Sequence, residues 1–192
     1  MRTRIETRAG EYRRRFAGFA FVAIATFALA LVFDRGEGHP SGLVAARARK
    51  PMPTVELKQL EGGLWRLAAH RGQVVVINYW ASWCAPCWEE APVFIRLSDE
   101  VGPKDLAIVG VAIDEGSPEY VDANVRSFVQ KLHVNYPIAL PVPMSQMAYG
   151  MEGLPTTILV DRRGQVAKSY VGAVREAELR IDIMALLNET AD

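Results

Sequence analysis

Cys84 and Cys87 stand three residues apart and are the two cysteines of this 192-residue chain. A thiol at the start of a helix is held as a thiolate more readily than free cysteine, because unpaired N–H groups and the helix dipole stabilise the negative charge. The second thiol would lie about one turn further along, within reach of the first. Such a pair can exchange disulfides: one thiolate attacks a disulfide sulfur, and the second resolves the mixed disulfide.

Other uses of two cysteines fit the rest of the sequence less well. A zinc site needs more ligands, and His39, His70 and His133 are isolated from one another. A purely structural disulfide over so short a loop would constrain the unfolded chain little. A peroxidatic cysteine usually follows Ser or Thr by three residues, whereas Ala81 holds that place before Cys84. We therefore predict a dithiol/disulfide redox centre, with a copper(I) metallochaperone that uses the same two thiolates as the alternative from another class.

The cysteine pair lies between a predicted strand and a predicted helix. The β-branched run 74–79 is typical of a strand that is buried on both faces. Pro86 suits the first turn of a helix, where its missing N–H costs no hydrogen bond. Apolar residues then repeat at helical spacing from Val93 to Val101. This arrangement would place Cys84 at the N-terminus of the helix.

Strand and helix signals alternate along the rest of the chain. We expect extended segments at 54–57, 64–67, 106–113, 137–140, 156–160 and 166–170, and helices over 121–132 and 179–187. A hairpin turn over 161–164 would join the last two strands. This order predicts an α/β fold in which helices flank a mixed central sheet.

Two segments carry a resemblance to a known family. Residues 77–92, INYWASWCAPCWEEAP, resemble the active-site segment of the thioredoxin superfamily, and more closely that of TlpA/ResA-like membrane-anchored thiol–disulfide oxidoreductases. Residues 153–161, GLPTTILVD, are similar to the family's cis-proline loop and the strand after it. The resemblance covers about residues 51–188. It implies a thioredoxin-like fold with a redox-active Cys84–Cys87 disulfide and no other cofactor or metal.

The resemblance also implies roles for residues near the pair. Cys84 would attack the client disulfide and Cys87 would resolve the mixed disulfide. A cis peptide bond before Pro155 would turn the backbone of Leu154 toward Cys84, so that a client strand can pair there. The residues expected to contact a client are Trp83, Ala85, Pro86 and Leu154.

Asn78 stands where cytoplasmic thioredoxins carry a buried aspartate, and an amide cannot take a proton. The proton acceptor for Cys87 must then come from elsewhere. Glu90 matches a glutamate that ResA-like proteins retain, and it lies three residues past Cys87 on the same helix. We expect Glu90 to tune the thiols, with a solvated first-turn carboxylate as the alternative. For Trp88 two interpretations remain open, a partner-binding surface and partly covered packing.

The N-terminal part of the chain has a different composition. Residues 1–50 hold ten Lys/Arg and four Asp/Glu, although the net charge of the chain is zero. Residues 16–33 carry no charge and would span roughly 27 Å as a helix, near the thickness of a bilayer core. With the basic residues before them, they predict a signal anchor in the bacterial inner membrane, with the soluble domain on the periplasmic side. A signal peptide cleaved after 28–30 is the alternative.

The expected domain organisation follows from these segments. It comprises a basic cytoplasmic segment at 1–15, a transmembrane helix at 16–33, a linker at 34–50 and a thioredoxin-like domain at 51–192. The balanced overall charge argues against nucleic-acid binding, and a chain that is 50% apolar is not intrinsically disordered as a whole. The spacing of Met144, Met147 and Met151 indicates helical packing, with copper ligation as the alternative.

These patterns and the resemblance predict a membrane-anchored reductase of disulfides in extracytoplasmic client proteins. A membrane electron donor of the thiol-transfer type would supply it. The family suggests clients in cytochrome c maturation or copper-oxidase assembly. A disulfide oxidase is the enzymatic alternative, but about forty residues separate Ile113 from Pro155, which leaves little room for the inserted helical domain of DsbA-like oxidases.

Overall fold

A six-stranded mixed sheet lies at the centre of the computed structural model, which describes residues 42–140 and 151–189. Across the sheet the strands are β1 (Lys50–Pro51), β8 (Gln165–Val171), β7 (Thr156–Val160), β4 (Val74–Trp80), β5 (Leu106–Ala112) and β6 (Ile138–Ala139). β5 runs parallel to β4 and β6, and the other neighbours are antiparallel. Every residue of β4 and β5 is buried, which confirms two strands covered on both faces.

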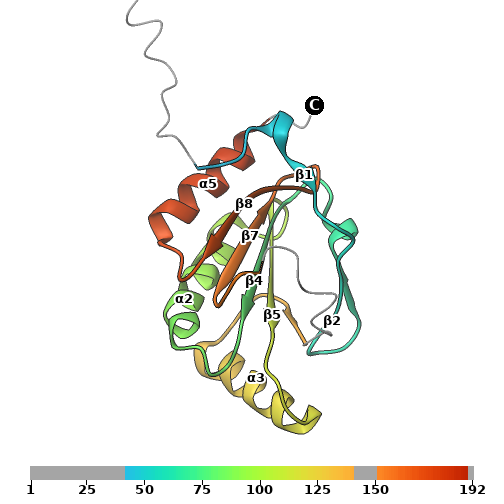
Figure 1. Ribbon diagram of the computed structural model, residues 1–192, viewed down its shortest axis with the longest axis vertical. Helices are drawn as coiled ribbons and strands as arrows, with labels where there is room; N and C mark the ends of the chain where they lie inside the picture. The colour runs from blue at the N-terminus through green and yellow to red at the C-terminus, as the bar shows by residue number, and fades with distance from the viewer. Residues whose placement is uncertain (1–41, 141–150, 190–192) are drawn as a thin grey trace, which may run out of the picture. The chain divides into compact units, whose positions relative to one another are not determined.

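Three helices share one hydrophobic cluster with one face of the sheet. They are α2 (Ala85–Val101), α3 (Pro118–Leu132) and α5 (Glu176–Asn188), and they confirm the three predicted helices. The other face packs against a hairpin of β2 (Glu56–Lys58) and β3 (Leu64–Arg66) and a short 3₁₀ helix, η2 (Leu67–His70). Figure 1 shows α2 and α5 on one side of the sheet and the hairpin on the other.

The ends of several strands meet at one edge of this sheet. Trp80 lies opposite Ala112, Tyr79 opposite Thr156, and Thr156 opposite Val171. β4, β5 and β8 therefore end where β7 begins, and α2 starts after the turn that follows β4. We call this the active edge. In open α/β sheets, residues that leave such an edge are brought together from distant parts of the sequence.

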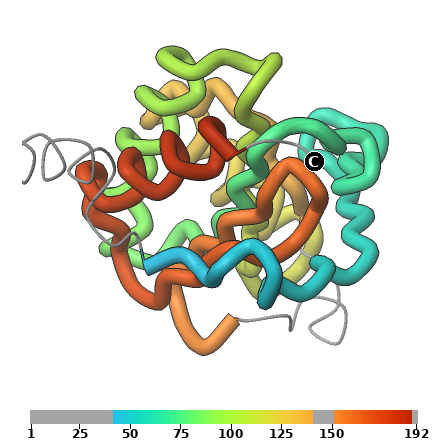
Figure 2. The backbone as a smooth tube through the Cα atoms, turned by 90° about the horizontal axis from the view of Figure 1, so that it is seen from above, coloured from blue at the N-terminus to red at the C-terminus, as the bar shows by residue number. Residues whose placement is uncertain are grey.

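Residues 42–50 belong to the folded domain and are not the linker expected over 34–50. The N–H of Val44 donates to the carbonyl of Ala167 at 2.8 Å, and β1 then pairs with the start of β8. Figure 2 shows this segment, which includes the short helix η1 (Ala46–Ala48), beside β8. The domain boundary predicted at residue 51 is therefore wrong, and the domain includes residues from at least 42.

A buried arginine holds this segment in place. Arg49 is 7% exposed, and its guanidinium donates to Asp161 at 3.1 Å and to both carboxylate oxygens of Glu189 at 2.6 and 2.7 Å. Its Nε donates to the carbonyl of Val44. The partners lie 112 and 140 residues away in sequence, so no local pattern in 34–50 reveals the contact.

Three sequence predictions fall outside the described residues. They concern the signal anchor at 16–33, the basic segment at 1–15, and Met144 and Met147. Within residues 42–140 and 151–189, no helix has both the length and the apolar character needed to cross a membrane.

Candidate active site

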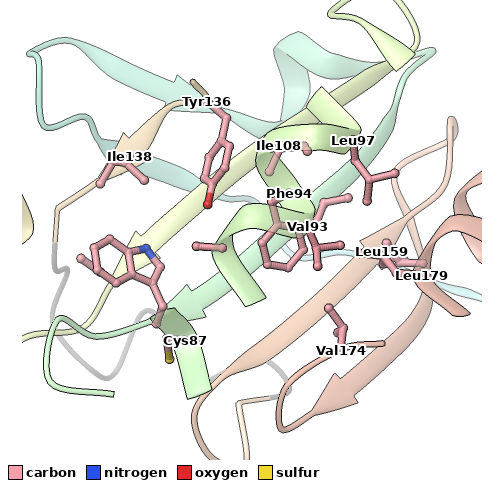
Figure 3. Close-up of a cluster of buried hydrophobic side chains, with 14 of the residues drawn as sticks. Cys87, Val93, Phe94, Leu97, Ile108, Tyr136, Ile138, Leu159, Val174 and Leu179 are labelled. Carbon is pink, nitrogen blue, oxygen red and sulfur yellow. The ribbon is translucent and has the colours of Figure 1, made fainter. Parts of the chain in front are cut away.

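Cys84 and Cys87 are joined by a disulfide at the start of α2. Cys84 occupies the N-cap position of α2. The backbone N–H of Cys84 donates to the carbonyl of Ala81, and the backbone N–H of Cys87 donates to the carbonyl of Cys84, each at 3.1 Å. Cys84 is 5% exposed and Cys87 1%. In Figure 3, Cys87 lies at one end of the buried cluster, with its sulfur turned away from Val93 and Phe94. Strand, cysteine pair and helix follow each other as predicted.

Glu90 is buried behind the pair, on the same helix. Its side chain is 2% exposed, and Oε1 accepts a hydrogen bond from the side-chain amide of Asn78 at 2.8 Å. Oε2 accepts from the backbone N–H of Val174 at 3.1 Å. The Asn78 amide also donates to the hydroxyl of Thr157 at 3.1 Å. The alternative of a solvated Glu90 is therefore wrong, whereas its neighbour Glu89 is exposed.

Burial raises the pKa of Glu90 to about 7, because removal from water disfavours the charged carboxylate. The hydrogen bonds from Val174 and Asn78 favour the charged form and partly offset this effect. Glu90 therefore holds or releases a proton near neutral pH, one helical turn beyond Cys87. Asn78, which cannot accept a proton there, positions the carboxyl that can.

The peptide bond between Leu154 and Pro155 is cis, as the resemblance implied. Pro155 is buried, and its carbonyl accepts from the N–H of Gly172 at 2.8 Å, just beyond β8. β7 begins at the next residue, Thr156, so this loop lies at the active edge together with the turn that carries Cys84.

The expected client-contact residues are exposed to different degrees. Trp83 is 69% exposed, Ala85 and Pro86 are exposed, and Leu154 is half-buried. Trp80, three residues before Trp83, is instead part of the core. The geometry is compatible with a contact surface around Cys84, and the client-binding roles themselves stay predictions.

Trp88 is packed into the domain, and this decides between its two interpretations. Its ring meets Phe128 of α3 edge-on, with ring centroids 4.5 Å apart, and the Lys131 ammonium lies 5.9 Å from its centroid. Its indole N–H donates to the carbonyl of Ser82 at 2.8 Å. Trp88 is half-buried, so partly covered packing is correct.

Sequence reasoning missed Ser82, Asp114 and Val174 as residues that shape the site. Asp114 is 3% exposed and binds Ser82. A polar residue directly after a buried strand that ends beside the cysteine turn was the available signal for Asp114. Val174 contributes a backbone N–H, which no residue type could indicate.

Residues 42–140 and 151–189 contain no group of three or more His, Cys, Asp or Glu side chains that could hold an ion. Met151 packs, half-buried, against the cluster on the hairpin face of the sheet.

Exchange of a disulfide at the start of a helix, on a sheet of this topology, is the chemistry of the thioredoxin-like thiol–disulfide oxidoreductases. The redoxin family model matches residues 47–183, and the chain belongs to that family. It is therefore a thioredoxin-like enzyme that exchanges thiols and disulfides through Cys84 and Cys87.

Relatives of known type agree with this class. The chain is 32% identical over 133 residues to the thioredoxin-like protein YneN of Bacillus subtilis, which covers 68% of this chain and 76% of that protein. It is also 32% identical over 129 residues to the thiol-disulfide oxidoreductase ResA of Geobacillus thermodenitrificans, covering 67% and 71%.

Solved structures show the same fold. A thioredoxin family protein of Chlorobium tepidum superposes with a TM-score of 0.65 at 23% identity, covering 75% of this chain and 100% of that one. A DsbF homologue of Corynebacterium diphtheriae gives a TM-score of 0.66 at 24% identity, covering 79% and 97%. At these identities the likeness establishes the thioredoxin-like fold alone.

Proposed function

We propose that this protein reduces disulfides of client proteins outside the cytoplasm, while residues 16–33 anchor it in the bacterial inner membrane. The exchange chemistry belongs to the class established above. The anchor and the periplasmic location are supported by the uncharged run and its basic flank. The anchor would place the protein near a membrane electron donor of the thiol-transfer type, which would supply the electrons.

The observation that carries the reaction is the placement of a buried, titratable carboxyl behind the cysteine pair. Cys84 begins α2, where backbone N–H groups favour its thiolate. Cys87 is almost fully covered and needs a base before it can act as a nucleophile. Glu90, with a pKa of about 7, can take that proton near neutral pH.

The reaction then proceeds in two exchanges. The Cys84 thiolate attacks one sulfur of the client disulfide, forms a mixed disulfide and releases one client thiolate, which takes a proton from the solvent. Cys87 gives its proton to Glu90 and attacks the sulfur of Cys84. This step forms the Cys84–Cys87 disulfide seen in the structure and releases the second client thiolate. Two electrons pass from the cysteine pair to the client, and the membrane donor would supply two more to reduce the Cys84–Cys87 disulfide again.

A protein client is favoured by the apolar side chains exposed at the active edge. Trp83 beside Cys84 is 69% exposed and Val171 at the end of β8 is 57% exposed. Large exposed apolar side chains next to a reactive group are typical of protein contact surfaces. Client strands would pair at Leu154, as in the sequence prediction. Proteins whose cysteine pairs must be reduced, for cytochrome c maturation or copper-oxidase assembly, are the client classes we propose.

Trapping with Cys87→Ser tests this function in cells of the source bacterium. Without its resolving thiol, the variant should retain clients on Cys84 as mixed disulfides that a reductant releases. The matched control Cys84→Ser/Cys87→Ser should trap nothing. Trapped proteins with periplasmic domains support the proposal, and exclusively cytoplasmic ones contradict the location.

The redox state of the wild-type pair in those cells tests the direction. A reductase should hold Cys84 and Cys87 mainly as thiols, measured by alkylation in acid-quenched cells. A pair that is mainly oxidised would indicate the oxidase alternative. Tight copper(I) binding by a pair that does not exchange with disulfides would instead indicate a metallochaperone.

A further inference from the structure

Ser82, two residues before the reactive cysteine, has all of its polar groups bound by two side chains. Its backbone N–H donates to both carboxylate oxygens of Asp114, at 3.2 and 3.0 Å, and its hydroxyl donates to the same carboxylate. Its carbonyl accepts from the indole N–H of Trp88 at 2.8 Å. Asp114 follows the end of β5 and Trp88 lies on α2, so Ser82 is hydrogen-bonded to two different parts of the fold.

Both partners of Ser82 are themselves immobilised. Asp114 is 3% exposed, and the preceding residue, Ile113, donates its N–H to the carbonyl of Trp80 at 2.9 Å. Trp88 packs edge-on against Phe128, which stacks on Trp80 with ring centroids 3.9 Å apart. The two side chains that bind Ser82 are therefore held in place by the core and by α3.

Ser82 lies inside the turn that carries the reactive sulfur. The turn is closed by a hydrogen bond from the N–H of Cys84 to the carbonyl of Ala81 at 3.1 Å, so Ser82 and Trp83 are its central residues. The side chain of Trp83 is largely exposed and offers little restraint. Restraint of the turn thus falls on Ser82.

We infer that Trp88 and Asp114 are positioning residues that hold Ser82, keep Cys84 close to Cys87, and so favour the disulfide over the dithiol. A disulfide needs its two Cα atoms within a narrow range of separations, and those of Cys84 and Cys87 are 5.3 Å apart. A turn that is free to move spends less time in that range, which lowers the effective concentration of one thiol at the other.

The equilibrium with glutathione measures this effect directly. Two thiols of the protein react with one oxidised glutathione, giving the Cys84–Cys87 disulfide and two glutathione thiols; two electrons and two protons pass to glutathione. If the contacts from Trp88 and Asp114 to Ser82 favour the disulfide, they raise the equilibrium constant of this reaction. Glutathione reports on the pair whether or not the chain is anchored and whichever way electrons flow in the cell.

The first test is Trp88→Phe in the full chain. Phenylalanine keeps a ring against Phe128 and loses the N–H that binds Ser82. We expect the glutathione equilibrium constant to fall about fivefold, the effect of one lost hydrogen bond. Trp65→Phe is the matched control, because the buried indole N–H of Trp65 has no hydrogen-bond partner among the described residues. That variant should stay within twofold of the parent.

A second variant leaves every ring and charge in place. Ser82→Ala removes the hydroxyl bond to Asp114 and should lower the same constant about threefold, because the hydrogen bonds of the Ser82 backbone N–H and carbonyl are retained. It decides the question if Trp88→Phe does not fold. Together the two changes should cost less than the product of their separate effects, because both act on one residue.

Three results would overturn the inference. One is a glutathione equilibrium constant that stays within twofold of the parent in Trp88→Phe, or in Ser82→Ala where Trp88→Phe does not fold. Another is an equal fall in Trp65→Phe, which would reflect lost ring volume. The third is a double variant whose effects multiply, because that would show that the two contacts act separately.

Discussion

Burial of the Glu90 carboxyl moves its pKa to about 7, into the range where enzymes use acids and bases. The shift has a structural cause, because the side chain is 2% exposed and no cation is among its hydrogen-bond partners, Asn78 and Val174. One helical turn separates Glu90 from Cys87. At the scale of single residues, the site therefore combines a disulfide at the start of α2 with a buried, titratable carboxyl one turn further along that helix.

Replacing Glu90 with Gln should remove a titration from the reaction. In the parent, the rate of exchange with a model disulfide should show an inflection near pH 7, where Glu90 loses its proton. We expect Glu90→Gln to lose this inflection and to react several-fold more slowly above pH 7. Glu89→Gln, at the exposed neighbour, is the control and should keep the parent profile. Identical profiles for all three proteins would remove Glu90 from the mechanism.

The same carboxyl should make folding stability fall with rising pH. Between pH 4.5 and 7 the unfolded chain releases the Glu90 proton while the folded chain keeps it, so the folded state binds more protons and loses stability as pH rises. The loss amounts to about 3 kcal/mol and is complete above pH 7. In denaturant unfolding of the oxidised proteins, the free energy of unfolding of Glu90→Gln relative to the parent should rise by about this amount between pH 4.5 and 7. A constant difference across this pH range would show that the carboxyl has an ordinary pKa when folded.

At the scale of elements, the contact between β4 and β5 depends on a glycine. A Cβ at Gly110 would lie 2.9 Å from the indole nitrogen of Trp80 and 2.8 Å from Cδ1 of Ile138. Trp80 stacks on Phe128, which also meets Trp88. The small residue in β5 thus lets the aromatic cluster beside the cysteine turn approach the sheet.

Gly110→Ala should therefore overpack this cluster. We expect the free energy of unfolding to fall by about 2 kcal/mol, within the range for added methyl groups in close-packed cores. Gly153→Ala is the control, since its Cβ would meet only ordinary contact, 3.8 Å from Val171. Denaturant unfolding measures both, and equal stabilities for the two variants would contradict the packing described here.

At the scale of the whole domain, Arg49 joins segments from both ends of the described chain. It links residues 42–50, the turn after β7 at Asp161, and Glu189 just after α5. Asp161 also accepts from the backbone N–H groups of Arg163 and Gln165, so the same carboxylate shapes the β7–β8 turn. These contacts hold residues 42–50 and β1, the outermost strand on this side, against the rest of the sheet.

Arg49→Met should destabilise the domain strongly. The substitution leaves the carboxylate of Asp161, 3% exposed, without its cation, and loss of one partner from a buried ion pair costs about 3 kcal/mol. Arg66→Met removes an exposed pair with Glu56 and should cost under about 1 kcal/mol. Thermal or denaturant unfolding of the two variants provides the comparison. Equal losses of stability would show that the buried ion pair of Arg49 stabilises the domain no more than an exposed one.

Most of the fold and the centre of the site could be predicted because their signals are local. A β-branched run predicts β4, and Pro86 with the apolar repeat after it predicts α2, so the cysteine pair could be placed between them. The cis-proline loop was likewise recognisable from one short segment. The ends of short strands were predicted less accurately. The first extended segment was expected at 54–57, whereas β2 covers Glu56–Lys58.

The sequence by itself determined the reactive pair, the helix that activates it and the class of enzyme, because each depends on neighbouring residues in one short segment. Only the tertiary structure decided that Glu90 is buried, that Arg49 belongs to the domain, and that Asp114 grips Ser82. Glu90 and Val174 are 84 residues apart, and Ser82 and Asp114 are 32 apart. Such pairs meet through strand register and helix packing, and hydrophobic periodicity encodes neither the partner nor the distance.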